Sequence, residues 1–154
     1  MSKHNWDIKK SFAIRLSSMG MLGLALLSST QWARENISST NTLFQFFLGV
    51  SPNIAAGYAM PLILASFIEK VAKNENKNEA RKTYLLVSAF TTFGLIVWEF
   101  IQVNSKNLYF DTNDIVATFI GTFLAYISYQ WLTKLKIPNE QDNADNGSGV
   151  TKKD

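Results

Sequence analysis

Four polar residues in the second half of the chain have the types and the spacing of a binding site. Glu99 is a carboxylate inside a long apolar stretch, and Gln102 follows it about one helical turn later. Asp114 opens the next apolar stretch, and Thr118 follows it one turn later. Carboxylates accept hydrogen bonds, hold cations and exchange protons. Because a charge within an apolar span is costly, such a residue usually faces protein or water.

Helical periodicity groups these residues on two faces. Steps of three and four residues collect the polarity of the first stretch on one face, which comprises Ser88, Thr92, Leu95, Glu99 and Gln102. We expect this face to point into a helical bundle. The next stretch carries small residues at four-residue steps, which predict close packing of the two helices: Ala117, Gly121 and Ala125.

A short loop between the two stretches would bring these polar residues together at one end of a helical hairpin. Asn53, near the start of an earlier apolar stretch, is expected at the same depth, and Arg34 and Lys106 are the nearby cations. The predicted ligand-binding group is therefore Glu99, Gln102, Asp114, Thr118, Asn53, Lys106 and Arg34.

Structural roles compete with this interpretation. Asp111 or Asn113 would cap the last helix, and Asp114 would favour its positive end. Gln102 would then be an interface residue. Glu99 would be a structural ion pair or a protonated hydrogen-bonding acid.

The elements that must position these residues follow from the distribution of charge. No charged residue lies between Arg15 and Arg34, between Glu35 and Glu69, or after Asp114 as far as Lys134. A helix needs roughly 20 mainly apolar residues to cross a bilayer. We predict an all-α membrane protein, a four-transmembrane-helix bundle with spans at about 11–32, 52–71, 83–103 and 114–132.

The connecting segments are predicted as follows. Residues 43–50 are apolar but too short to span, so we expect an interfacial or re-entrant segment before the second span. Ser51 and Pro52 form a good helix start, and Pro61 should kink the second span. Residues 1–10 form a cytoplasmic N-terminus, and the polar tail at 138–154 is expected to be disordered.

Basic residues predict the topology. Of the 15 lysine and arginine residues, all but Arg34 and Lys106 flank the same ends of the spans. By the positive-inside rule, both termini are cytoplasmic and the two short loops are external. An alternative for the first span is a cleaved secretory signal with its apolar core at residues 16–27.

Composition limits the possible chemistry. The chain has no cysteine, which removes disulfides and thiolate catalysis. The net charge of +3 comes from residues between apolar spans rather than from a basic face, so nucleic acid is not an expected partner. The one histidine, His4, has the character of a solvated residue, and no cofactor or metal motif is present. We therefore expect no cofactor and no enzymatic activity, although Glu99 and Asp114 could in principle act as an acid and base pair.

The polar residues resemble a pattern of the VanZ-like family of small bacterial membrane proteins. The matching segments are Glu99-Phe-Ile-Gln102 and Asp114-Ile-Val-Ala-Thr118-Phe-Ile-Gly121. Family members typically show Glu-x-x-Gln, a loop with a basic residue, and Asp-x-x-x-Asn-x-x-Gly. Lys106 takes the basic place, and Thr118 replaces the asparagine. Asn53 stands where many relatives carry a polar residue or histidine.

The resemblance covers about residues 45–132 and implies a role in the cell envelope, in the bacterial cytoplasmic membrane. The name-giving member is linked to low-level teicoplanin resistance, and the family's mechanism is not established. The leading hypothesis is a non-enzymatic protein whose outer polar cluster binds a lipid headgroup, an envelope precursor or an amphiphilic drug. The alternatives are a small transporter that uses Glu99 for proton or cation coupling, and a membrane scaffold that forms homo-oligomers through Gly121 and Ala125.

Overall fold

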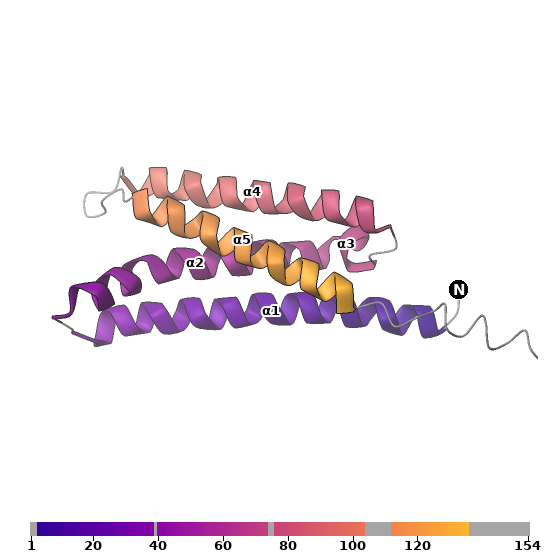
Figure 1. The fold of residues 1–154 in the computed structure, drawn as a ribbon, viewed down its shortest axis with the longest axis horizontal. Helices are drawn as coiled ribbons and strands as arrows, with labels where there is room; N and C mark the ends of the chain where they lie inside the picture. Colours follow the sequence, from indigo (N-terminus) through magenta and orange to yellow (C-terminus); the bar gives the residue numbers. More distant parts are fainter. Residues whose placement is uncertain (1–2, 39, 74–75, 104–111, 136–154) are drawn as a thin grey trace, which may run out of the picture.

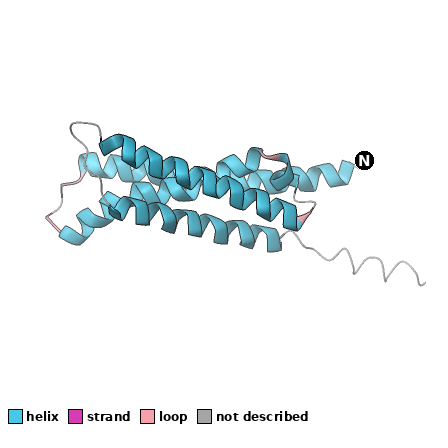
Figure 2. Ribbon diagram, turned by 90° about the horizontal axis from the view of Figure 1, so that it is seen from above, coloured by secondary structure: helices cyan, strands magenta, loops and turns pink. Residues whose placement is uncertain are grey.

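The computed structural model describes residues 3–38, 40–73, 76–103 and 112–135, and this part of the chain is helical throughout apart from short connections (Figure 2). The helices are α1 (Lys3–Asn36), α2 (Thr42–Phe67), α3 (Glu69–Lys73), α4 (Lys77–Val103) and α5 (Thr112–Leu135). All of them except α3 are long and apolar enough to cross a membrane, giving four candidate spans. The predicted membrane-protein class and the number of spans are confirmed, and the chain has the pattern of a multi-pass membrane protein.

The helices form a bundle with α2 in its interior. Helix α2 contacts each of the other helices, whereas α1 and α4 do not touch and lie on opposite sides of α2 and α5 (Figure 1). Helices α1 and α4 run in one direction, and α2 and α5 run in the other. We call the end with the α1–α2 and α4–α5 connections the distal end, and the end with α3 the proximal end.

The second span begins earlier than the sequence predicted. Helix α2 starts at Thr42, and the side chain of Asn41 caps it by accepting hydrogen bonds from the amides of Leu43 at 3.0 Å and Phe44 at 3.3 Å. The separate segment expected at residues 43–50 and the helix start expected at Pro52 are therefore wrong. These residues instead form the first turns of α2, which are inclined to the rest of the helix (Figure 1).

The difference arises because the chain is already helical when it reaches Ser51. The hydroxyl of Ser51 donates to the carbonyl oxygen of Phe47, one turn earlier in the same helix. Pro52 then sits inside α2, where its missing amide and its ring favour a bend.

Small residues let the backbones of α1, α2 and α5 approach closely. A side-chain carbon added at Gly23 would lie 2.9 Å from the Cβ of Ala59, and one at Gly57 would lie 2.5 Å from the carbonyl oxygen of Thr118. The glycines of α1 therefore serve a close helix contact, one of the two roles open to them from sequence.

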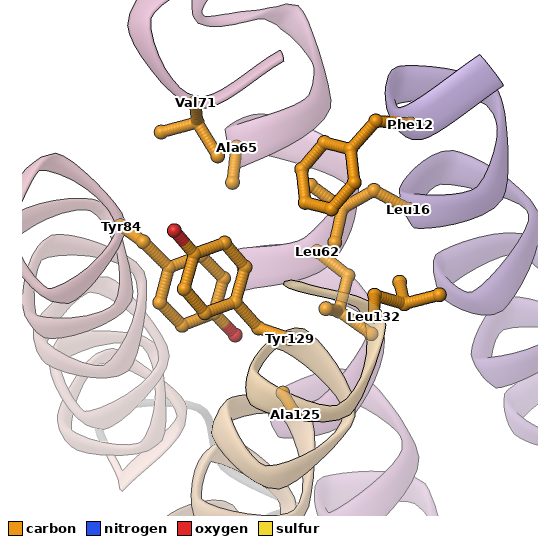
Figure 3. Packing of buried hydrophobic residues seen from close by; sticks show 9 residues of the cluster. All are labelled: Phe12, Leu16, Leu62, Ala65, Val71, Tyr84, Ala125, Tyr129 and Leu132. Carbon is orange, nitrogen blue, oxygen red and sulfur yellow. The ribbon is translucent and has the colours of Figure 1, made fainter. Parts of the chain in front are cut away.

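The buried core is concentrated in the proximal half. The rings of Tyr84 and Tyr129 stack at 4.0 Å between α4 and α5, and Phe12 meets Tyr129 edge-on (Figure 3). Leu16 and Leu62 are fully buried beside them. Outside the core, large apolar side chains face outward along every span, as expected for helices surrounded by lipid.

The tail at 138–154 lies outside the described residues, while residues 3–10 continue α1.

Candidate functional site

Glu99 faces the interior of the bundle one turn before the distal end of α4. Its side chain is 8% exposed, whereas its neighbours Trp98 and Phe100 are each 57% exposed. The helix therefore turns its apolar residues outward and its carboxylate inward, as the periodicity predicted. A buried carboxylate is stable only if neighbouring polar groups or bound molecules replace the lost water.

Asp114 lies in the first turn of α5, partly buried. Glu99 lies one turn before the end of α4, and α4 and α5 are in contact, so the two carboxylates are at the same end of neighbouring helices. Within the described part of the chain, Glu99 forms no ion pair. The described residues thus place two acidic groups at the same end of the bundle and supply no cation between them, and such a pair attracts a cation, a proton or hydrogen-bond donors.

Thr118 and Asn53 complete this group. Thr118 is 2% exposed, and its hydroxyl donates to the backbone carbonyl oxygen of Asp114 at 2.9 Å. Its own backbone lies against Gly57 of α2. Because α2 and α5 run in the same direction, Asn53 and Asp114, each one turn distal to this contact, are at the same level of the bundle. We call these four residues, Glu99, Asp114, Thr118 and Asn53, the distal polar cluster.

A row of buried hydroxyls continues from the cluster toward the proximal end. Ser88, Thr91 and Thr92 of α4 are 5%, 7% and 7% exposed. Thr92 is hydrogen-bonded to Thr122 of α5 at 2.9 Å. Thr122 in turn donates to the carbonyl oxygen of Thr118 at 3.0 Å. The predicted inward face of α4 is confirmed for Ser88, Thr92 and Glu99, and the sequence analysis missed the contribution of Thr91 and Thr122.

The position of Arg34 corrects the predicted binding group. Arg34 lies in the last turn of α1, and α1 does not contact α4. Helices α2 and α5 therefore stand between this guanidinium and Glu99. The sequence showed only that both residues are near the same end of their spans, which says nothing about their positions around the bundle.

Several of the other residues singled out in the sequence lie wholly or partly outside the described part of the structure. Gln102 belongs to α4, but its side chain lies outside the described part of the structure, as do Lys106 and Asp111. Asn113 is the second residue of α5 rather than the residue before it. The ligand roles of Gln102 and Lys106 stay predictions.

The small residues of α5 pack differently from the prediction. Ala117, Gly121 and Ala125 are all buried. The neighbours of Gly121, however, are the backbone atoms of Ile54 and Tyr58 on α2, not residues of α4. Helix α5 therefore uses this stripe to contact α2. Gly121 and Ala125 are buried within the chain, and the homo-oligomeric scaffold stays a prediction.

The fold and the site together define a multi-pass helical membrane protein with an acidic group buried near one end of its bundle. The chain matches no protein-family model, and searches of the curated proteins and of the solved structures find no match.

Proposed function

We propose that the chain is a VanZ-like, non-enzymatic protein of the cell envelope whose distal polar cluster binds the headgroup of an amphiphile. The headgroup would belong to a lipid, an envelope precursor or an amphiphilic drug. The observation that carries this proposal is the burial of Glu99 beside Asp114 without a cation from the described residues. A headgroup with an amine or other donors would supply the missing partner.

The proposed location is the bacterial cytoplasmic membrane, with both termini in the cytoplasm and the distal end outside. The support is the concentration of basic residues near the proximal end, including Lys70, Lys73 and Lys77 in and around α3. In this orientation the distal polar cluster would meet molecules in the outer leaflet.

The test compares amphiphiles that share one chain but differ in headgroup. The purified protein in dodecyl maltoside micelles is heated with dodecylammonium or with dodecyl phosphate, each below its own micelle-forming concentration. We expect dodecylammonium to raise the unfolding temperature, since a ligand at 100 times its dissociation constant stabilises the folded state by about 2.7 kcal/mol. Dodecyl phosphate is the control for binding away from Glu99, so any shift it gives should be the same in the wild-type protein and in a variant without the Glu99 carboxylate.

Variants of α4 assign the effect to the cluster. Glu99→Gln keeps the shape of the side chain and removes its charge, so the stabilisation by dodecylammonium should disappear. Glu79→Gln removes an exposed carboxylate from the proximal end of the same helix and should leave the stabilisation intact. Equal stabilisation of the wild-type protein and Glu99→Gln would refute the proposal.

The row of buried hydroxyls favours a second candidate, a small transporter in which Glu99 exchanges a proton or cation. Ser88, Thr91 and Thr92 extend the polarity of Glu99 along the interior of α4. An ionisable residue inside a membrane span often marks an ion or proton pathway, and hydroxyl groups beside it can pass hydrogen bonds along such a path. Proton flux into liposomes that contain the protein, followed by an internal pH dye, should fall in Glu99→Gln. A flux that is the same in the variant would remove this candidate.

A further inference from the structure

A cleft on the side of the bundle away from α4 is the most informative feature that the proposed function does not use. It has a volume of about 470 Å³ and lies between α1, α2 and α5. This volume falls within the range of about 300–1,000 Å³ usual for small-molecule sites. Its walls include Leu22 and Leu26 of α1, Ile54 and Ala55 of α2, and Leu124 of α5.

The walls of the cleft suit a hydrocarbon chain rather than a polar ligand. Its three hydroxyl-bearing residues are already engaged elsewhere. Thr30 donates to the carbonyl oxygen of Leu27 at 2.9 Å, and Ser51 donates to that of Phe47. The third, Tyr58, is hydrogen-bonded to Ser128 at 3.2 Å. Cavities without free polar groups stay dry and accept apolar molecules.

The cleft opens sideways toward the surroundings of the bundle. Leu22 and Leu26, on its rim, are 66% and 60% exposed. All three helices that form it are candidate membrane spans, so its opening faces the hydrocarbon of the bilayer. The molecules that surround the opening are therefore lipid chains.

Arg34 lies at the distal end of the side of α1 that lines the cleft. Leu22, Leu26, Thr30 and Arg34 follow one another at four-residue steps along α1, so they share one side of the helix. Arg34 lies about 6 Å beyond Thr30 along the axis, at about 1.5 Å per residue. It is exposed in the last turn of α1, at the end of the span where headgroups begin. A guanidinium binds phosphate through paired hydrogen bonds.

We propose that this cleft binds an anionic phospholipid, with one acyl chain between α1, α2 and α5 and the phosphate at Arg34. The site is separate from the distal polar cluster, because Arg34 and Glu99 lie on opposite sides of α2 and α5. The inference does not depend on the function proposed above.

The experiment is native mass spectrometry of the full chain in detergent, with dioleoyl phosphatidylglycerol or dioleoyl phosphatidylcholine added at equal concentration. The two lipids have the same chains and differ in net charge. We expect the wild-type protein to retain one phosphatidylglycerol several times more often than one phosphatidylcholine. Arg34→Gln should lower phosphatidylglycerol retention several-fold and phosphatidylcholine retention less, because both lipids carry a phosphate but only the former has a net negative charge, and the preference between them should be lost.

Filling the cleft should reduce the retention of both lipids. Leu26→Trp places a large side chain in its opening, and Leu86→Trp is the matched control on the exposed face of α4, where the leucine is 72% exposed. We expect a several-fold loss for Leu26→Trp and none for Leu86→Trp. Equal retention in both variants, or unchanged lipid selectivity in Arg34→Gln, would overturn the proposal. A lipid-free dimer that Leu26→Trp dissociates would overturn it in favour of a second copy of the chain.

A measurement on the wild-type protein covers the case in which a variant does not fold. Phosphatidylglycerol with a photoreactive diazirine in one acyl chain is added at one molecule per protein and activated by light. We expect cross-links to concentrate in the peptides that contain Leu26 and Ile54. Cross-links spread evenly over the exposed apolar faces, including that of Leu86, would contradict a specific site.

Discussion

Among the described residues, the buried hydroxyls of Tyr84 and Tyr129 have no hydrogen-bond partner of normal geometry. Their rings are nearly parallel, 6° apart, in the tightest part of the proximal core. A buried hydroxyl without a partner costs about 1–3 kcal/mol relative to one that is satisfied. The packing of the two rings therefore stabilises the folded protein, whereas their unsatisfied hydroxyls lower its stability.

Removing one of these hydroxyls should therefore stabilise the protein. We expect Tyr84→Phe to raise the free energy of unfolding in micelles by about 1 kcal/mol. Tyr58→Phe is the matched control, because the hydroxyl of Tyr58 is bonded to Ser128 and its loss should lower stability by about 1 kcal/mol. Chemical unfolding followed by circular dichroism measures both. A Tyr84→Phe protein less stable than the wild type would show that the hydroxyl is satisfied, either by Ser88 one turn along α4 or by a bound water.

At the same scale, the sequence predicted the direction of side chains better than their partners. Glu99 was correctly placed on the inward face because helical periodicity fixes which residues share a side. Arg34 was wrongly grouped with it because depth along a span does not determine the angle around the bundle. Asn53 reaches the level of Asp114 only because α2 and α5 happen to be neighbours, which no local pattern encodes.

At the scale of the helices, the close contact between α2 and α5 requires glycine, which has no side chain, at the points where the two backbones meet. A carbon added at Gly121 would collide with backbone atoms of Ile54, and backbone cannot move aside as a flexible side chain can. Gly94 of α4 is the opposite case, with no atom within 4 Å of an added carbon.

These two glycines give a matched pair of substitutions. Gly121→Ala should lower the free energy of unfolding by about 1–3 kcal/mol, the usual cost of overpacking. Gly94→Ala should raise it by roughly 0.5–1 kcal/mol, since alanine is the better helix former. Unfolding in micelles measures both changes. If the two variants were equally stable, the close approach of α2 and α5 would be refuted.

The sequence predicted the four long helices, but it did not predict where α2 begins or which helix packs against α5. Four apolar stretches of sufficient length predict four helices whatever their packing. The start of α2 lies at Asn41, a cap that the sequence analysis did not consider when it placed the helix start at Ser51 and Pro52. The small-residue stripe of α5 correctly predicted close packing, but α4 was assumed to be its partner because α4 is nearest in sequence.

For the molecule as a whole, the central prediction concerns its orientation in the membrane. The absence of cysteine allows single cysteines to be introduced without background labelling. In intact cells, a membrane-impermeant maleimide should label Thr40→Cys at the distal end. Asn78→Cys at the proximal end should react only after the cells are opened. The reverse pattern would place the distal polar cluster in the cytoplasm.

The order of the helices along the chain has a consequence for synthesis. Helix α4, with Glu99, leaves the ribosome before α5, with Asp114 and Thr118. A lone α4 would carry its carboxylate into the bilayer before α5, against which α4 packs in the folded bundle, has been made. Co-insertion of α4 and α5 as a pair avoids that exposure, and the short connection between them makes such pairing fast. Lengthening this connection should therefore slow the maturation of the protein more than lengthening the connection between α1 and α2.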